Sequence, residues 1–101
     1  MQTTKPDKPD HEPKTVHVTV HNEDDGDTYH LNAKRDDALA GVIAELYDKK
    51  LRRDRQADDR LSCERGGEDV FPSESLSFGE YLDQGHCPDL EWLFAGGTGG
   101  A

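Results

Sequence analysis

The chain has 101 residues, of which 34% are charged and 32% are hydrophobic, and its formal net charge at pH 7 is −10. This length allows one domain with a single modest core, but not two domains. The acidic balance disfavours nucleic acid and anionic lipid as partners, and no apolar run approaches the roughly 20 residues that a membrane-spanning helix needs.

Residues 1–13 mix lysine, proline, aspartate, threonine and histidine, and Met1 is their only large apolar side chain. Because burial cannot offset the entropy lost on ordering such a segment, we expect a disordered leader. The segment also lacks the apolar stretch of a secretory signal, so we expect a cytoplasmic protein. In a reducing cytoplasm, Cys63 and Cys87 are expected to be free thiols rather than a disulfide.

A β-hairpin is predicted after the leader. In "KTVHVTVHN", valine alternates with polar residues, which predicts a half-buried strand. The following "EDDGD" predicts a turn in which Gly26 takes a positive φ. In "TYHLNA", Tyr29 and Leu31 then share one face of a second strand.

The hydrophobic period changes to that of an α-helix in "RDDALAGVIAELYDKKLRR". Apolar side chains recur there at i, i+3, i+4, i+7 and i+8, and the predicted buried stripe is Leu39, Val42, Ile43, Leu46 and Tyr47. Asp36 or Asp37 is the expected N-cap, and the basic residues from Lys49 onward suit the negative end of the helix dipole. Gly41 costs the helix up to about 1 kcal/mol and is expected to allow close approach to the sheet.

A second hairpin is predicted in "RLSCERGGEDVF". It consists of a strand "RLSC", a turn at the glycine pair, and a return strand that begins at Val70 and Phe71 and ends at Pro72. "SESLSFGEYL" then predicts a short helical turn that offers apolar side chains to the core.

Alternating Leu90, Trp92 and Phe94 predict the last strand. Trp92 and Phe94 could form an exposed partner patch or the inner face of this strand, and we predict the inner face. The element order is β-β-α-β-β-β, which predicts an α+β fold in which one helix packs on a mixed sheet. We expect this domain over residues 14–94 and a flexible Gly-rich tail over residues 95–101.

This order, in a domain of this size with a Gly-Gly tail, resembles ubiquitin and the β-grasp family. The stretch "DRLSCERGGEDVFPSESLSFGEYL" resembles a ubiquitin segment in which Arg-Leu opens a strand, a glycine lies in the hairpin turn, and Leu-Ser precedes an aromatic in a short helical turn. The matching residues here are Arg60, Leu61, Gly66, Leu76, Ser77 and Tyr81. The resemblance covers residues 14–100 and implies the ubiquitin-like β-grasp fold.

The tail "AGGTGG" has a length similar to that of ubiquitin's tail, which places Gly99 and Gly100 in register with the family's terminal glycine pair. The resemblance implies a protein modifier rather than an enzyme. Its Gly100 carboxylate would be adenylated by an ATP-dependent activating enzyme, transferred as a thioester to a conjugating enzyme, and joined to target proteins. A residue without a Cβ suits the narrow channels of these enzymes. The chain itself would bind no cofactor and would be a monomer when free.

Ala101 follows the glycine pair, so the resemblance implies a precursor that a zinc-dependent, deubiquitinase-like peptidase shortens. Cleavage after Gly100 is preferred to the alternative, cleavage after Gly97, because only one residue is then removed. Ubiquitin's tail carries arginines that contact the activating enzyme, and this tail has none. A eukaryotic-type activating enzyme is therefore not expected to handle the chain well. The implied setting is a bacterial operon for a ubiquitin-like modifier and its enzymes, of the kind often tied to antiphage defence.

Two other functions remain open. A β-grasp sulfur carrier would convert its terminal glycine into a thiocarboxylate, although Ala101 and the leader argue against this. A β-grasp binding module would need no C-terminal chemistry. Replacing Gly100 should abolish the function of a modifier or a sulfur carrier and leave a binding module intact.

Five histidines raise the question of a metal site. His17 and His21 share a strand face but lie about 13 Å apart along the strand, too far to bind one ion. His86 and Cys87 lack a second pair of ligands, and "EDDGD" lacks the full spacing of a calcium loop. We therefore predict no metal site, with His17 and His21 on a solvated face.

The exposed residues that could contact partner proteins are the last feature that the sequence suggests. If Trp92 and Phe94 are buried, Leu93 lies outside, and the chain lacks an obvious counterpart of ubiquitin's apolar recognition patch. Five lysines could accept a further copy of the chain, or they could be ordinary solvated side chains. They are Lys5, Lys8, Lys34, Lys49 and Lys50.

Overall fold

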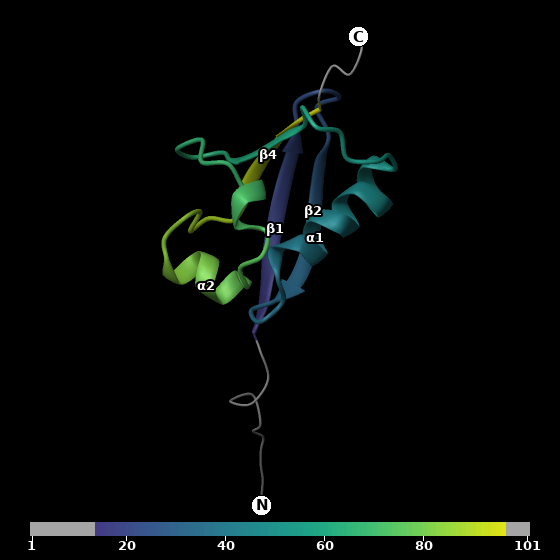
Figure 1. Ribbon diagram of the computed structural model, residues 1–101. Helices are drawn as coiled ribbons and strands as arrows, with labels where there is room; N and C mark the ends of the chain where they lie inside the picture. Colours follow the sequence, from purple (N-terminus) through teal and green to yellow (C-terminus); the bar gives the residue numbers. More distant parts are fainter. Residues whose placement is uncertain (1–13, 97–101) are drawn as a thin grey trace, which may run out of the picture.

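The computed structural model describes residues 14–96 (Figure 1). The predicted leader, residues 1–13, and residues 97–101 lie outside the described residues. In chain order the elements are β1 (Thr15–Asn22), β2 (Thr28–Lys34), α1 (Leu39–Glu45), the π-helical segment η3 (Leu46–Leu51), β3 (Arg60–Cys63), the 3₁₀ turn η4 (Phe71–Ser73), α2 (Phe78–Asp83) and β4 (Glu91–Ala95). None of the helices between residues 14 and 96 has the length and apolar character that crossing a membrane requires.

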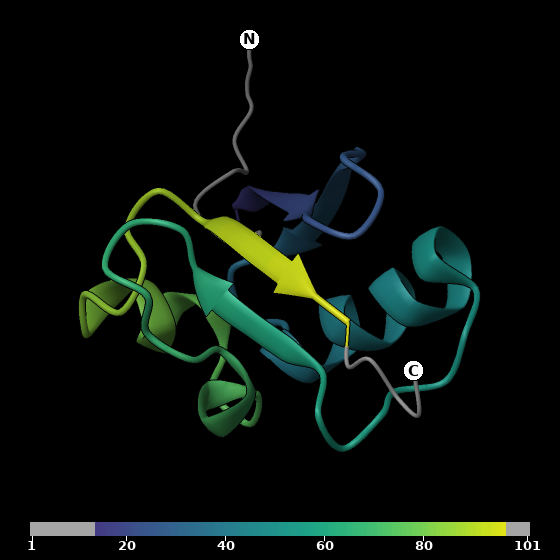
Figure 2. The same ribbon diagram turned by 90° about the horizontal axis from the view of Figure 1, so that it is seen from above.

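Four strands form one mixed sheet in the order β2-β1-β4-β3, so β4 runs between β1 and β3 (Figure 2). β1 pairs antiparallel with β2 and parallel with β4, and β3 pairs antiparallel with β4. The predicted first hairpin is confirmed, and Gly26 in its turn has a φ of 78°. The inward side chains of the sheet join those of α1 and α2 in one hydrophobic cluster. This arrangement confirms the predicted α+β architecture, with a helix packed on a mixed sheet.

The predicted return strand at Val70 and Phe71 is wrong. After the glycine turn there is one isolated bridge, between Ser62 and Asp69, and Phe71 then begins the turn η4. The Val70 amide donates to a carbonyl of β3 at 2.8 Å, but Pro72 has no amide hydrogen with which to extend a ladder. The sheet therefore has four strands within residues 14–96, not five.

The predicted buried stripe of the helix is confirmed, since all five of its side chains are at most 7% exposed. The predicted N-cap is wrong, because α1 begins after Ala38 and no side chain caps it. Asp37 instead accepts a hydrogen bond from the Lys34 amide at 2.9 Å and closes the turn after β2. A Cβ on Gly41 would meet no described atom within 4 Å, so the expected close approach of Gly41 to the sheet is also wrong.

The short helical turn predicted before the last strand is α2. Ser77 caps it by accepting a hydrogen bond from the Glu80 amide at 3.1 Å, and the Glu80 carboxylate accepts one from the Ser77 amide at 3.0 Å. Such a reciprocal capping box satisfies two amides that a helix N-terminus otherwise leaves unpaired. The helix contributes buried Phe78 and Tyr81 to the core.

Trp92 and Phe94 on β4 are 0% and 1% exposed, which confirms that they belong to the core. Leu93, between them, faces the other side of the sheet and is only partly buried. This alternation follows from the two-residue period of a strand.

The two cysteines form a disulfide, Cys63–Cys87, so the prediction of free thiols is wrong. Cys63 ends β3, and Cys87 lies in the loop that leads into β4. Because β3 pairs antiparallel with β4, the two Cα atoms come to 5.7 Å, within the usual range for disulfides. The prediction rested on the expected compartment, and the sequence separation of 24 residues gives no indication of this proximity.

Candidate functional site at the root of the C-terminal tail

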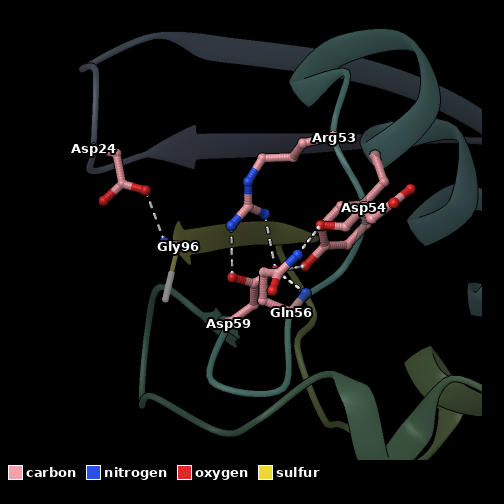
Figure 3. Close-up of polar contacts among 7 residues, drawn as sticks. Asp24, Arg53, Asp54, Gln56, Asp59 and Gly96 are labelled. Carbon is pink, nitrogen blue, oxygen red and sulfur yellow. Dashed lines mark hydrogen bonds and ion pairs between the residues drawn. The ribbon is translucent and has the colours of Figure 1, made fainter. Parts of the chain in front are cut away.

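Gly96 is the last described residue, and it is the root of the C-terminal tail. Its amide donates a hydrogen bond to Asp24 Oδ2, in the turn between β1 and β2, at 2.8 Å (Figure 3). The residues predicted for conjugation and processing lie outside the described residues: Gly97, Gly99, Gly100 and Ala101. They continue the chain from this root.

A buried polar network lies next to the root, and Asp59 is at its centre (Figure 3). The Asp59 carboxylate is 0% exposed. It accepts hydrogen bonds from the Tyr47 hydroxyl at 2.7 Å, from Arg53 Nη1 and Nη2 at 2.9 Å each, and from the Gln56 amide at 2.8 Å. A buried carboxylate is tolerated when it is paired and its oxygens are satisfied in this way. These four residues are the Asp59 network, which connects the helical segment, the loop after it and the start of β3.

A backbone reversal after η3 brings Arg53 to Asp59. Arg52 has a φ of 58° and a ψ of 47°, in the left-handed region, and its amide donates to the Tyr47 carbonyl at 2.7 Å. This conformation costs a residue with a side chain roughly 1–2 kcal/mol. The reversal therefore has to be offset by the contacts that the loop makes afterwards, of which the paired hydrogen bonds between Arg53 and Asp59 are the strongest in kind.

Arg53 also connects the network to the end of β4. Its guanidinium carbon lies 5.6 Å from the Phe94 ring centroid and 5.9 Å from the Tyr47 ring centroid, distances at which cation–π attraction contributes. A Cβ on Gly96 would lie 2.5 Å from Asp24 Oδ2 and 3.3 Å from Arg53 Nη2. A side chain at the root would therefore displace the hydrogen bond that holds the root.

The network keeps its protons at neutral pH. Burial, and then the hydrogen bond to Asp59, raises the pKa of Tyr47 well above its ordinary value of 10. The hydrogen bond to Asp59 also raises the pKa of Arg53 above its ordinary value. The phenol and the guanidinium therefore remain hydrogen-bond donors at any physiological pH.

Basic side chains gather on the surface beside the network. Between Lys49 and Arg55, seven consecutive positions contain five of the chain's 12 lysines and arginines. An open groove of about 800 Å³ is lined there by Tyr47 and by acidic and basic side chains, of which the basic ones are more numerous. We call it the basic groove and define it by its cationic side chains, Lys49, Arg52, Arg53 and Arg55. In a chain of net charge −10, this is a local reversal of sign next to the tail root.

The histidines considered in the sequence lie apart from this site. His17 is exposed on the outer face of the sheet, and its Nδ1 is 2.7 Å from Asn32 Oδ1. His86 contacts Glu68 through Nδ1, and Cys87 is in the disulfide. The structure does not bring these candidate ligands together.

The other candidate positions lie on the surface or outside the described residues. In the acidic turn "EDDGD", a carboxylate accepts a hydrogen bond from the turn's own backbone: the Asp27 amide donates to Asp25 Oδ1 at 2.9 Å. Of the candidate acceptor lysines, three are exposed, and Lys5 and Lys8 lie outside the described residues; the exposed ones are Lys34, Lys49 and Lys50.

Sequence reasoning missed the Asp59 network. The basic residues from Lys49 onward are predicted to suit the helix dipole, and the polar stretch from Asp54 to Arg60 has no hydrophobic period. One signal was present: Asp59 lies two residues before the apolar Leu61, so an extended chain places both side chains on the same, inward face. An acidic side chain so close to the core needs a cationic partner, and Arg53 was available.

Comparison with known proteins supports the fold. The sequence matches no protein-family model and no curated protein. Among solved structures, the chain is similar to the solution structure of the UBL domain of yeast Ddi1, with a TM-score of 0.60 and 23% identity over 84% of this chain and 92% of that chain. Likeness at this identity shows the fold alone, and it confirms the predicted ubiquitin-like β-grasp fold.

Proposed function

We propose that the chain is a ubiquitin-like protein modifier that is conjugated to other proteins through the carboxylate of Gly100. The observation that carries this proposal is the tail root. β4 is an interior strand of the sheet and ends at Ala95, and Asp24 holds Gly96 directly beyond it. Gly100 follows four residues later in the sequence, a span of at most about 14 Å. One enzyme could therefore contact the domain surface at the root and the Gly100 carboxylate together.

In the proposed reaction, the Gly100 carboxylate attacks the α-phosphate of ATP, and pyrophosphate leaves. A cysteine thiolate of the activating enzyme then displaces AMP and forms a thioester, which is passed to a conjugating enzyme. An amine of the target displaces that thiol and forms an isopeptide bond. The chain supplies the carboxylate and a glycine backbone that fits narrow channels, and the partner enzymes supply the nucleophiles. In this proposal the chain is a carrier and not an enzyme.

The basic groove is the proposed contact surface for the activating enzyme. It lies beside the root, and its positive charge is the complement of an acidic partner segment. Ubiquitin, which the chain resembles, offers arginines from its tail, and this tail contains none. Arg52, which is exposed, would offer the same chemistry from the domain, whereas Arg55 Nη1 is paired with Glu74 at 3.0 Å.

The remaining parts of the proposal follow the resemblance. A zinc-dependent, deubiquitinase-like peptidase hydrolyses the Gly100–Ala101 bond, with Gly97 as the alternative end. The setting is the cytoplasm of a bacterium whose operon encodes the partner enzymes and serves antiphage defence.

Intact mass spectrometry tests the proposal. The chain is co-expressed with the products of its neighbouring genes, purified and incubated with ATP. We expect a mass that ends at Gly100, followed by an adduct with a neighbouring protein that thiol reagents release. Gly100→Val should abolish the adduct. The double variant Lys49→Glu/Arg52→Glu should slow its formation while the processed mass stays the same. A mass gain equal to sulfur replacing oxygen would indicate the sulfur carrier instead.

A β-grasp binding module is the second candidate function. It is favoured by one observation, namely that the similar solved structure is described as a UBL domain of another protein rather than as a free modifier. An unchanged mass in the presence of neighbours whose activity has been verified would support the module and contradict conjugation.

A further inference from the structure

Three side chains with metal-binding atoms meet on the outer face of the sheet. They are His21 near the end of β1, Glu64 directly after β3, and Glu91 at the start of β4. One ligand atom from each lies within 4.8 Å of the other two, and His21 Nε2 is 3.4 Å from Glu64 Oε1. For His21, the sequence pattern offered only His17 on the same strand as a second ligand, because Glu64 and Glu91 are far from it along the chain.

The backbone fixes this meeting point. β1 runs parallel to β4 with Thr19 opposite Glu91, so His21 lies one pleat further along the same face. The Glu64 amide donates to the Glu91 carbonyl at 2.8 Å, which holds the two glutamates side by side. Because like charges repel at this spacing, the pair favours a cation between them.

A hydrogen bond orients the imidazole for this role. His21 Nδ1 is 3.0 Å from Thr28 Oγ1, and the opposite ring nitrogen, Nε2, faces Glu64. When Nδ1 carries the hydrogen and donates it to Thr28, the Nε2 lone pair points at the space between the carboxylates. Histidine ligands in metal sites usually have such a partner on the second ring nitrogen, which fixes the tautomer and the ring orientation.

The ligand set indicates the class of cation. Two ligands about 2.0–2.1 Å from a tetrahedral zinc ion lie about 3.4 Å apart, which matches the separation between His21 and Glu64. One imidazole nitrogen with carboxylate oxygens suits zinc and its neighbours in the first transition row, whereas calcium and magnesium prefer six or more oxygens. The glutamates are exposed, so a fourth position would be open to water or to a ligand from a partner.

We infer that His21, Glu64 and Glu91 form a binding site for one divalent transition-metal cation, for which Zn²⁺ is the probe. The ion would bridge the outer faces of β1, β3 and β4 without touching the core. This inference does not depend on the proposed conjugation, since no residue of the tail or of the basic groove takes part.

Calorimetric titration of the full chain with ZnCl₂, followed by ¹H–¹⁵N NMR, tests the inference. We expect one Zn²⁺ per chain, amide shifts centred on His21, Glu64 and Glu91, and a melting temperature that rises with Zn²⁺. His21→Ala should weaken binding by at least about 100-fold, and Thr28→Val by about tenfold, because it removes only the support of the ring. Mg²⁺ at the same concentration should leave the spectrum unchanged.

His17→Ala is the matched control. His17 lies on the same strand and face, and its Nδ1 also has a partner, Asn32, but it does not belong to the cluster of carboxylates. This variant should bind Zn²⁺ like the parent chain. Glu64→Gln keeps the shape of the site and should still lose most of the affinity, which separates lost ligation from lost folding. Unchanged affinity in both His21→Ala and Glu64→Gln, or no binding by the parent chain at 1 mM Zn²⁺, would overturn the inference.

Discussion

Trp92 and Phe94 are two residues apart on the inward face of β4, but different kinds of contact fix them. Trp92 packs between aromatic rings, with the Phe78 ring stacked at 6.3 Å and the Tyr81 ring edge-on at 6.2 Å. The disulfide joins the chain near this end of the strand. Phe94 instead meets the Tyr47 ring at 5.9 Å and lies under the guanidinium of the Asp59 network.

The difference separates the end of β4 that mainly stabilises the fold from the end that positions the tail root. The Trp92 end is mostly apolar and is closed by the disulfide, and burial of its rings is the main source of its stability. The Phe94 end contains a buried charge pair, whose desolvation offsets much of its attraction. Removing one partner leaves the other charge uncompensated and is strongly destabilising. What the polar end does provide is a fixed position for the residues around the tail root, since Arg53 lies beside Gly96.

The largest expected effect is at the apolar end. Trp92→Ala should reduce the free energy of unfolding by about 3–5 kcal/mol, because it removes a fully buried indole. Urea denaturation followed by circular dichroism measures this. The neighbouring Leu93→Ala, on the outer face, should cost less than about 1 kcal/mol. Equal losses would show that the two faces of β4 are not distinguished by burial.

The polar end should be nearly as sensitive. Asp59→Ala leaves the Tyr47 hydroxyl and the Arg53 guanidinium without their acceptor, and should cost about 3 kcal/mol in the same measurement. Asp54→Ala, an exposed carboxylate in the same loop, should change stability by less than about 0.5 kcal/mol. If the two variants were equally stable, the network would not contribute to folding.

Reduction of the disulfide should lower the stability of the whole domain without moving the residues at the polar end. A crosslink with a separation of 24 residues contributes roughly 3 kcal/mol by restricting the unfolded chain. Unfolding with and without a phosphine reductant measures the loss. The double variant Cys63→Ala/Cys87→Ala should be less stable and insensitive to reductant. The NMR shifts around Asp24 and Gly96 should stay the same in the reduced protein, whereas movement there would indicate that the two ends are coupled.

High pH should weaken the polar end. The pKa of Tyr47 is raised in the folded state, so its stabilising contribution is complete below pH 10 and is lost as the pH rises above 10. By pH 11 the loss should reach about 1 kcal/mol. Urea denaturation between pH 8 and pH 11 measures it. Burial raises the pKa of Tyr81 as well, which adds a loss of the same sign. Tyr47→Phe should retain the Tyr81 loss and show a smaller total slope; an unchanged slope would contradict the role given to Tyr47.

The smallest expected effects come from two glycines with opposite signs. Gly96→Ala should cost about 0.5–1 kcal/mol, since its Cβ displaces the Asp24 carboxylate. Gly41→Ala should stabilise the domain by up to about 1 kcal/mol, because the helix gains a better helix former in open space. Thermal melting of both variants distinguishes them, and an unchanged or raised melting temperature for Gly96→Ala would contradict the contacts at the root.

The apolar part of the fold could be predicted from the sequence, because burial leaves a period. The valines of β1, the stripe of α1 and the alternation at Trp92 and Phe94 each repeat at the spacing of their element. Contacts between segments leave no such period. The disulfide depends on the pairing of β3 with β4, and the pairing of Arg53 with Asp59 depends on the reversal at Arg52.

The candidate site could be predicted only in part, for the same reason. The glycine pair can be identified in the amino-acid sequence. The basic groove beside the root and the cluster of His21, Glu64 and Glu91 form only when the chain folds.

The identity of the branch on a conjugated target tests the proposed function most directly. Conjugates are purified from cells that express the chain with its neighbouring genes and digested with a protease that cleaves after glutamate. A cut after Glu91 leaves residues 92–100, WLFAGGTGG, on the acceptor side chain. We predict this branch on target lysines, and its absence with Gly100→Val. A branch of residues 92–97 would move the conjugation site to Gly97. Recovery of the chain with no branched target, in the presence of active neighbouring enzymes, would contradict the modifier function.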